Sequence, residues 1–439
     1  MIAPLIARAP QERPPGSPAP TRRVLILAYD FPPRGATGVV RVAKFVRYLP
    51  EFGWQPVVVA ATARGGLRDE GLLRQLPPDL EIVRVDNPLA PRASLLAAHR
   101  AQPSLRARLR RALRQAVVPD AQIVWALRAA RVAARRLARG DIAAIFSTAP
   151  PFSVHMAALV LKRRLPALPW IMDLRDIWSE HPTITSLLQY RLQRACEGAC
   201  LRAADHVVTA TAGQRALLLT AFGLPAQRIT TITNGFDPAD LPPLAPPPAR
   251  PELCLTYVGS IVANRAAATR GFFAALTQLM ARGITPADLQ VRLIGIFDPQ
   301  IYAWAAPLTQ AGLVQLRPFV PQAAAYAEMA AADVLLLLAA DDREGRLSHP
   351  NKLFEYWGMG RPMLALVPDG DVARLVRDSG TGLTVAPGDV DGIVVALERL
   401  LAEHRAGTLT GQLDPERLRP FERRELTRRL AALLDAVTA

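Results

Sequence analysis

The sequence predicts an α/β protein of two doubly wound domains, each with a parallel sheet covered by helices. Three observations support this fold class. Short aliphatic runs alternate with helix-length segments along almost the whole chain. Seven prolines between residues 238 and 251 interrupt this alternation, because proline neither pairs in a central strand nor continues a helix. The alternation then begins again, which indicates a second domain.

The first domain is expected at residues 21–240 and the second at residues 252–414, joined by a proline-rich linker at residues 241–251. Strand candidates of the first domain begin at residues 24, 56, 81, 142, 170, 206 and 229. Those of the second are LCLTYVG, QVRLIG, VQLRPF, DVLLLL, PMLALV and GLTVAP, with helices at about residues 266–282, 322–331, 350–359 and 389–402. We expect the two Rossmann-like sheets to face each other across a cleft, with ligands at the carboxyl ends of their strands.

The composition is that of a folded chain, with 50% hydrophobic and 21% charged residues among 439. Three cysteines (Cys196, Cys200 and Cys254) cannot form a disulfide framework, so a reducing, cytoplasmic compartment is expected. The longest apolar run, residues 334–340, is too short to span a bilayer. Residues 1–20 are rich in proline and lack a signal-peptide core, and we predict a disordered leader there.

Positive charge is concentrated in the first half of the chain. The net charge is +15, yet residues 1–240 contain 33 Lys and Arg against 17 Asp and Glu, while the remainder is nearly balanced. Residues 92–139 hold twelve arginines and one acid, Asp120, in segments that place arginine beside an apolar helical stripe. An anionic membrane surface and a nucleic acid both fit this pattern, as does a solvated helix face.

The first predicted strand runs into AYDFPPRGATGVVRVAK, a tight loop with Gly35 and Gly38 before an amphipathic helix at residues 39–52. The amino end of that helix suits a phosphate, although any turn between a strand and a helix favours glycine. The wider string resembles the amino-terminal signature of GT-B glycosyltransferases of family 4. The matching residues are Phe31, Pro32, Pro33, Gly35, Gly38, Arg41, Gly53 and Trp54.

The resemblance extends along most of the chain after the leader. Asn234, Gly235 and Asp237 are similar to the turn that closes the family's first domain, and TYVGSI resembles the first strand and glycine loop of its second domain. LSHPNKLFEYWGMGRPMLAL resembles the donor-binding helix and the strand after it. The resemblance implies a GT-B enzyme that moves a sugar from a nucleotide diphosphate sugar, without a bound metal or other cofactor and with retention of anomeric configuration.

The donor-binding segment also has a physical interpretation of its own. Ser348 is a candidate N-cap and Pro350 a first-turn residue, so a helix is expected to begin in the cleft. Lys352 in its first turn adds positive charge for a departing diphosphate. Glu355, one turn later on the same face, suits the hydroxyls of a ribose. An exposed lysine–glutamate pair on a capped helix would explain the same spacing.

The sequence WIMDLRDIWSEHP ends a predicted strand with Asp173, Arg175 and Asp176. Carboxylates at a strand's carboxyl end are placed to orient an acceptor hydroxyl, and Asp176 is the first choice for that role. The alternative is that both acids cap the next segment and pair with Arg175. These three residues are the catalytic candidates.

The resemblance places the donor against Gly259, Ser260, Arg265, His349, Asn351, Lys352 and Glu355. It places the acceptor, a glycan or lipid-linked saccharide, near the loop residues Gly35, Gly38 and Arg41 and near Arg175 and Asp176. The last helix, at about residues 415–437, is expected to cross back onto the first domain. One departure concerns the sugar hydroxyls: the family's first donor-site glutamate corresponds to Leu347, and Glu344 lies nearby but out of register.

Two other functions remain open at the level of sequence: a sugar-nucleotide epimerase or hydrolase on the same scaffold, and a basic nucleic-acid-binding protein. No P-loop, GxGxxG fingerprint, HExxH or GxSxG motif occurs. Asp369 and Asp371 mimic a metal-binding DxD, but they lie where a turn is expected, and no metal site is predicted. Because the arginines fall in the acceptor-side half, we expect peripheral association with the inner face of the cell membrane.

Overall fold

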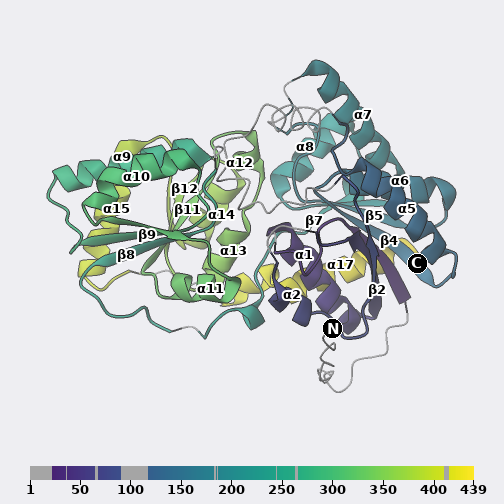
Figure 1. Cartoon of the computed structure of the whole chain (residues 1–439), viewed down its shortest axis with the longest axis horizontal. Coiled ribbons are helices and arrows are strands. Elements are labelled where there is room, and N and C mark those ends of the chain that lie inside the picture. The colour runs from purple at the N-terminus through teal and green to yellow at the C-terminus, as the bar shows by residue number, and fades with distance from the viewer. Residues whose placement is uncertain are drawn as a thin grey trace, which may run out of the picture. The chain divides into compact units, whose positions relative to one another are not determined.

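The computed structural model (Figure 1) describes residues 22–35, 37–64, 68–89, 117–181, 184, 186–243, 245–262, 265–409 and 415–439. The predicted leader at residues 1–20 lies outside these ranges, as do the seven arginines between residues 92 and 114. The chain divides into two compact units. The first unit comprises Met1–Asp173, Ala199–His206 and Thr427–Ala439, and the second comprises Leu174–Gly198 and Val207–Leu426. The domain boundaries expected at residues 240 and 252 stay a prediction.

The first sheet has seven strands in the order β3-β2-β1-β4-β5-β6-β7. All seven strands predicted for this half are present. β1 pairs in parallel with β2 and β4, and its apolar side chains are buried on both faces, which explains why the run VLILA does not alternate with polar residues. The strands are β1 (Arg22–Ala28), β2 (Trp54–Ala61), β3 (Glu81–Val85), β4 (Ile142–Ala149), β5 (Trp170–Leu174), β6 (His206–Thr209) and β7 (Ile229–Thr231).

Helices separate these strands along the chain. The helix expected at residues 39–52 begins at Thr37 and ends at Tyr48, and a 3-10 turn, Leu49–Phe52, completes the segment. Pro50 explains the early end, because it has no N–H for the α-helical ladder. The other helices are α2 (Glu70–Arg74), α5 (Ile123–Leu137), α6 (Ser153–Arg164), α7 (Leu187–Ala203) and α8 (Ala212–Phe222), followed by 3-10 turns at Ala226–Arg228 and Pro238–Asp240.

α5 is the described part of the arginine-rich stretch. Its apolar stripe, including Trp125, Ala129 and Ala133, is buried against the protein. Arg136 is buried as well and is neutralised by Glu81 at 2.8 Å and Asp141 at 2.5 Å. The exposed arginines of the helix, Arg128, Arg131 and Arg135, follow helical spacing. α5 therefore turns a basic face to solvent and keeps its apolar face in the core.

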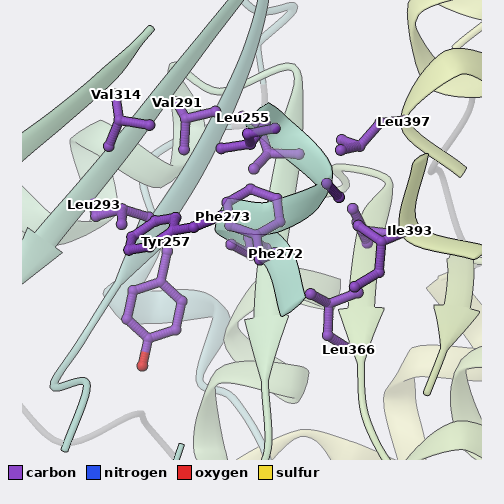
Figure 2. Close-up of a cluster of buried hydrophobic side chains, with 14 of the residues drawn as sticks. Leu255, Tyr257, Phe272, Phe273, Val291, Leu293, Val314, Leu366, Ile393 and Leu397 are labelled. Atoms are coloured by element: carbon purple, nitrogen blue, oxygen red, sulfur yellow. The ribbon is translucent and has the colours of Figure 1, made fainter. Parts of the chain in front are cut away.

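The second sheet has six strands in the order β10-β9-β8-β11-β12-β13, and all six were predicted. Alternate residues of its central strands enter two separate hydrophobic clusters, one on each face. Leu255 and Tyr257 of β8 enter the cluster shown in Figure 2, with Phe272 from α9 and Leu397 from α15. The strands are β8 (Leu253–Val258), β9 (Leu289–Gly295), β10 (Val314–Pro318), β11 (Val334–Leu338), β12 (Met363–Leu366) and β13 (Gly382–Val385).

Four of the helices around this sheet lie close to the predicted ranges: α9 (Ala266–Ala281), α11 (Gln322–Ala330), α13 (Asn351–Gly358) and α15 (Val390–Arg405). The others are α10 (Pro299–Gln310), α12 (Arg343–Leu347), α14 (Asp371–Ser379) and the short α16 (Pro415–Leu418), followed by a 3-10 turn at Arg419–Phe421. In Figure 1 α9, α10 and α15 gather on one side of the sheet and α11, α13 and α14 on the other. This is the doubly wound arrangement expected from the sequence.

The final helix, α17 (Arg423–Thr438), contributes most of its length to the first unit. Near its end, Asp435 accepts a hydrogen bond of 3.1 Å from the Trp54 indole of β2 and lies 3.3 Å from Arg22 of β1. Buried Leu430 and Leu434 fix the apolar face of the helix. The carboxyl-terminal residues of the chain therefore pack on its first two strands.

Candidate functional site

The loop after β8 brings two backbones and one lysine unusually close. Gly259 has a φ of +147°, and its N–H donates to the Ile294 carbonyl at 2.7 Å. A Cβ at this position would lie 2.3 Å from Cε of Lys352. Gly295, with a φ of +152°, passes so near that a Cβ there would lie 1.9 Å from the Gly259 carbonyl oxygen. Only glycine allows this approach, which sets Lys352 against the end of the central strand.

Lys352 is the second residue of α13 and is half-buried. Burial lowers the pKa of its ammonium group, Glu355 opposes that shift, and the charge of Arg265 adds to it. Within the described part of the chain, no oxygen accepts a hydrogen bond from Nζ. A partly desolvated cation without an acceptor favours an anionic ligand, because such a ligand would supply the missing partner.

Arg265 and Tyr257 converge on Ser260 from two elements. The Arg265 guanidinium donates to the Ser260 carbonyl at 3.0 Å, and the Tyr257 hydroxyl donates to the same oxygen at 2.9 Å. Figure 2 shows this hydroxyl pointing away from the hydrophobic cluster that holds its ring. The loop after β8 is thus fixed by polar contacts at the carboxyl end of the strand.

The segment between α12 and α13 differs from the sequence-based expectation. Ser348 was expected to cap the donor-binding helix, and that prediction is wrong: Ser348 follows α12 and its N–H donates to the Glu344 carbonyl, while Pro350 is the N-cap of α13. The reason is α12 itself, a five-residue helix that the sequence did not predict and that takes Ser348 as its own terminus. α13 therefore begins without a side-chain cap.

His349 is 7% exposed and packs its ring edge-on against Phe354. In the described ranges, neither ring nitrogen has a hydrogen-bond partner. Burial lowers the pKa of His349 to about 4, with Asp371 opposing the shift and Arg374 adding to it. The imidazole is therefore neutral at neutral pH, with one donor and one acceptor nitrogen available just before α13.

Glu344 in α12 lies among charged groups of the second unit. Its carboxylate is 3.5 Å from Nε2 of His181. Burial raises the pKa of Glu344, His181 and Arg265 oppose that shift, and Asp176 and Asp342 add to it. The structure therefore brings together Asp176, Glu344 and Arg265, three residues that the sequence singled out separately. His181 was not predicted as a site residue. The one sequence feature that could have indicated it is its position shortly after a predicted strand.

Glu355 lies one turn after Lys352 and is half-buried, as expected for two residues on one helix face. Its charge also raises the pKa of Tyr326 in α11, after the larger effect of burial. Asn351 is the first residue of α13. Gly259, Ser260, Arg265, His349, Asn351, Lys352 and Glu355 thus all lie on the β8 loop, at the start of α9, or at the amino end of α13.

Asp173 and Arg41 form a buried ion pair in the first unit. The Arg41 guanidinium donates to the two carboxylate oxygens at 2.8 and 3.1 Å, and the Thr148 hydroxyl donates at 2.7 Å. Both side chains are at most 1% exposed. Asp176 and Arg175 lie instead in the second unit, where the Arg175 carbonyl accepts from Gln214 at 3.0 Å. Of the three catalytic candidates, Asp176 is the one whose charge acts on Glu344.

Gly35 and Gly38 flank the start of α1 in the first unit. Gly35 lies beside the backbone of Arg68 and Asp69, and Gly38 is the second residue of the helix. In the described ranges no group of three or more His, Cys, Asp or Glu side chains is arranged to hold a metal ion. None of the helices in those ranges is both long and apolar enough to cross a bilayer.

Two family models match the chain, one after the other. Residues 37–235 match a glycosyl transferase 4-like domain, and residues 252–403 match the glycosyl transferases group 1. The chain belongs to the family 4-like glycosyltransferases. It is an enzyme that transfers a sugar from a nucleotide sugar, which confirms the family resemblance and the enzyme class predicted from the sequence.

Solved structures confirm the GT-B fold of this glycosyltransferase. HepE of Anabaena in complex with UDP has 15% sequence identity and a TM-score of 0.63 over 94% of this chain and all of that one. Sucrose-phosphate synthase of Thermosynechococcus elongatus has 14% identity and a TM-score of 0.67, over 94% and 98%. The lipopolysaccharide outer core galactosyltransferase WaaB has 14% identity and a TM-score of 0.60, over 94% and 99%. No curated protein sequence matches the glycosyltransferase.

Proposed function

We propose that the β8 loop and the amino end of α13 bind the diphosphate of the donor sugar nucleotide. The observation that carries this proposal is the half-buried ammonium of Lys352, held beside Gly259 without an acceptor among the described residues. The amino end of α13, which has no side-chain cap, adds positive potential at the same place. Arg265 supplies a second cation, and the neutral His349 supplies a hydrogen-bond donor.

These groups suit a transfer reaction that needs no metal ion. As the glycosidic bond of the donor breaks, negative charge accumulates on the departing diphosphate. Lys352 and Arg265 stabilise this charge where a divalent cation would otherwise do so. Glu355 then holds the ribose hydroxyls, since a carboxylate accepts two hydrogen bonds. As the family resemblance implies, we expect the anomeric configuration to be retained.

Asp176 and Glu344 are proposed to hold the reacting sugars. Leu347 cannot bind a hydroxyl, and Glu344 is the acid whose carboxylate lies near both Arg265 and Asp176. We assign Glu344 to the donor sugar hydroxyls and Asp176 to the orientation of the acceptor hydroxyl. His181, at 3.5 Å from Glu344, fixes that carboxylate in place.

The acceptor is proposed to be a glycan, presented on a lipid at an anionic membrane surface. The net positive charge of the first half supports this assignment, as do the exposed arginines of α5. WaaB, the lipopolysaccharide outer core galactosyltransferase, has the same fold. Association with the inner face of the membrane is part of the same proposal.

The test is the substitution Lys352→Met, with UDP-glucose as the probe because HepE was solved with that ligand. Wild-type enzyme should be stabilised by UDP-glucose in a thermal melt, since a ligand that binds only the folded state raises its melting temperature. K352M should lose at least 100-fold in affinity. Without ligand it should melt no lower than wild type, because the substitution removes a desolvated charge.

Lys162→Met is the matched control. It also removes one lysine charge, but Lys162 pairs with Asp205 at 2.7 Å in the first unit. K162M should keep wild-type affinity for UDP-glucose. Equal affinity in K352M and wild type would contradict the donor-site assignment, and rapid consumption of UDP-glucose without any acceptor would favour an epimerase or a hydrolase.

A further inference from the structure

Three arginines lie at the carboxyl ends of three neighbouring strands in the first unit. β3, β2 and β1 are adjacent in the sheet, and Arg84 of β3 pairs in register with Ala60 near the end of β2. Arg64 follows β2, and Arg34 follows β1 in the loop that leads to α1. This edge of a parallel sheet is where ligands of doubly wound folds bind.

Arg84 carries a positive charge that no carboxylate neutralises in the described ranges. Its guanidinium donates to the Ala61 carbonyl at 3.2 Å and to the Pro32 carbonyl, and it lies 5.6 Å from the centre of the buried Phe31 ring. Two of its five N–H groups are therefore directed at carbonyls, and the side chain is half-buried. The structure holds this cation in a fixed orientation, with no carboxylate paired to it among the described residues.

A second guanidinium lies beside the first. Arg34 stacks 5.1 Å from the Tyr29 ring and bonds to Asp30 at 2.7 Å, and its buried Nε has no partner among the described residues. Burial lowers the pKa of Arg84, and the like charge of Arg34 lowers it further. Two guanidiniums thus lie beside the Phe31–Pro33 turn, and the carboxylate of Asp30 pairs with Arg34, not with Arg84.

The neighbouring elements favour an anion at the same place. α1 begins three residues after Arg34 and has no acidic residue in its first turn, which favours an anion near its amino end. Arg41, which the sequence placed near the acceptor, is paired with the buried Asp173 carboxylate through two hydrogen bonds. Among the described arginines beside this loop, Arg84 is the one without a carboxylate partner.

We propose that Arg84, with Arg34 beside it, binds a phosphate group carried by the acceptor substrate. This inference rests on the proposed function, because it takes the acceptor to bind in the first unit. Guanidinium and phosphate fit each other through two parallel N–H···O bonds, a geometry that lysine does not reproduce. The ligand class is a phosphate monoester or diester attached to a glycan, either soluble or as the headgroup of a lipid.

The experiment compares Arg84→Gln with Arg64→Gln in the full-length enzyme. Arg64 lies at the same edge but is exposed and paired with Asp86 at 3.0 Å, so R64Q is a matched control. The probes are glycerol 3-phosphate, followed by ³¹P NMR in saturating UDP, and phosphatidylcholine vesicles with one third phosphatidic acid. Saturating UDP keeps the phosphate ester out of the proposed donor site.

Wild type and R64Q should bind glycerol 3-phosphate equally, and R84Q at least ten-fold more weakly. If only the vesicles bind wild type and R84Q weakens that binding, the phosphate belongs to a lipid headgroup. Equal binding of both probes to wild type and R84Q overturns the proposal, and so does the absence of any binding to wild type. Arg84→Lys keeps the charge, and its affinity for glycerol 3-phosphate should lie between those of wild type and R84Q. This variant keeps the proposal testable if R84Q fails to fold.

Failure of this inference and failure of the donor-site assignment are separable. R84Q should keep the UDP affinity of wild type, because Arg84 lies in the first unit and the donor groups lie in the second. K352M should keep the glycerol 3-phosphate affinity for the same reason. If wild-type enzyme does not bind UDP at all, the donor-site assignment is contradicted. Binding of glycerol 3-phosphate to wild type and R84Q can then still be compared in buffer without UDP.

Discussion

At the residue scale, the contact between Gly259 and Lys352 determines the geometry of the proposed donor site. The absent side chain at Gly259 is what allows the ammonium to approach the end of β8, since a Cβ there would lie 2.3 Å from Cε and 2.8 Å from Nζ of Lys352. Glycine at this position therefore has a function beyond its backbone conformation. It determines where the positive charge lies.

Gly259→Ala should displace Lys352 and weaken UDP-glucose binding by at least ten-fold, as measured by calorimetry. The positive φ should also lower the free energy of unfolding by about 1–2 kcal/mol. Gly283→Ala is the control, because Gly283 has a φ of +91° but nothing within 4 Å of a Cβ. G283A should show the destabilisation alone. A G259A variant that binds the donor as tightly as wild type would remove Gly259 from the site.

The sequence predicted the local features of the site and missed those that depend on distant partners. The spacing of Lys352 and Glu355 places them on one face of any helix, so that relation was readable without a structure. The pairing of Arg41 with Asp173, 132 positions away, was not, because no local pattern records which acid meets which base. For the same reason Arg84 was not predicted as a binding residue, because the segment EIVRV shows only the pattern of a strand.

At the scale of elements, all thirteen strands were predicted because their aliphatic runs are short, continuous and bounded by turn residues. Three helices of the second half, α10, α12 and α14, were not predicted, and two of them have evident reasons. α12 has only five residues, too few for a periodic pattern, and α10 contains Pro307. Missing α12 led directly to the wrong N-cap for α13, since Ser348 looked available when it already ended another helix.

α5 provides a test of the membrane proposal. Its exposed face carries Arg128, Arg131 and Arg135 beside Leu127, which is 44% exposed, and most of its apolar side chains are buried, so we expect membrane contact by this helix to be mainly electrostatic. Replacing all three by Gln should lower binding to anionic vesicles by about 100-fold, at about 1 kcal/mol per arginine. The measurement is flotation with phosphatidylglycerol-containing vesicles at low salt, where screening is weakest.

The control replaces three exposed arginines of the second half, Arg282, Arg399 and Arg405, by Gln. Each of these is already paired with an acid, at 2.6–2.7 Å, so the substitutions remove the same formal charge but little net attraction for lipid. This variant should float like wild type. A wild-type enzyme that does not float with anionic vesicles would contradict the membrane proposal as a whole.

At the scale of the whole molecule, two buried groups give the stability of the chain opposite dependences on pH. Glu197 in α7 is 2% exposed and accepts a hydrogen bond from the Ser179 N–H at 3.0 Å. Burial raises the pKa of Glu197 to about 7, from 4.5 in the unfolded chain. Burial lowers the pKa of His349 to about 4, from 6.5. Between about pH 4 and pH 7, both groups are therefore mostly neutral in the folded chain.

The direction in which stability changes with pH depends on whether the folded or the unfolded chain binds the proton more tightly. The raised pKa of Glu197 means that its contribution to stability is complete below pH 4.5 and is lost as pH rises to 7. The lowered pKa of His349 means that its contribution is complete above pH 6.5 and is lost as pH falls to 4. Each shift corresponds to about 3 kcal/mol. Between pH 4.5 and 6.5 the two contributions offset each other in the wild-type enzyme.

Glu197→Gln should expose the contribution of His349. The difference in free energy of unfolding between E197Q and wild type should grow in favour of E197Q by up to about 3 kcal/mol between pH 4.5 and 7, because only wild type must ionise a buried carboxyl group.

His349→Asn should show the reverse, with the stability of the variant rising relative to that of wild type as pH falls from 6.5 to 4. Urea unfolding at a series of pH values measures both. The control Glu398→Gln, at an exposed residue of α15, should track wild type. If the free energies of unfolding of E197Q and wild type change in parallel between pH 4.5 and 7, the fold does not raise the pKa of Glu197.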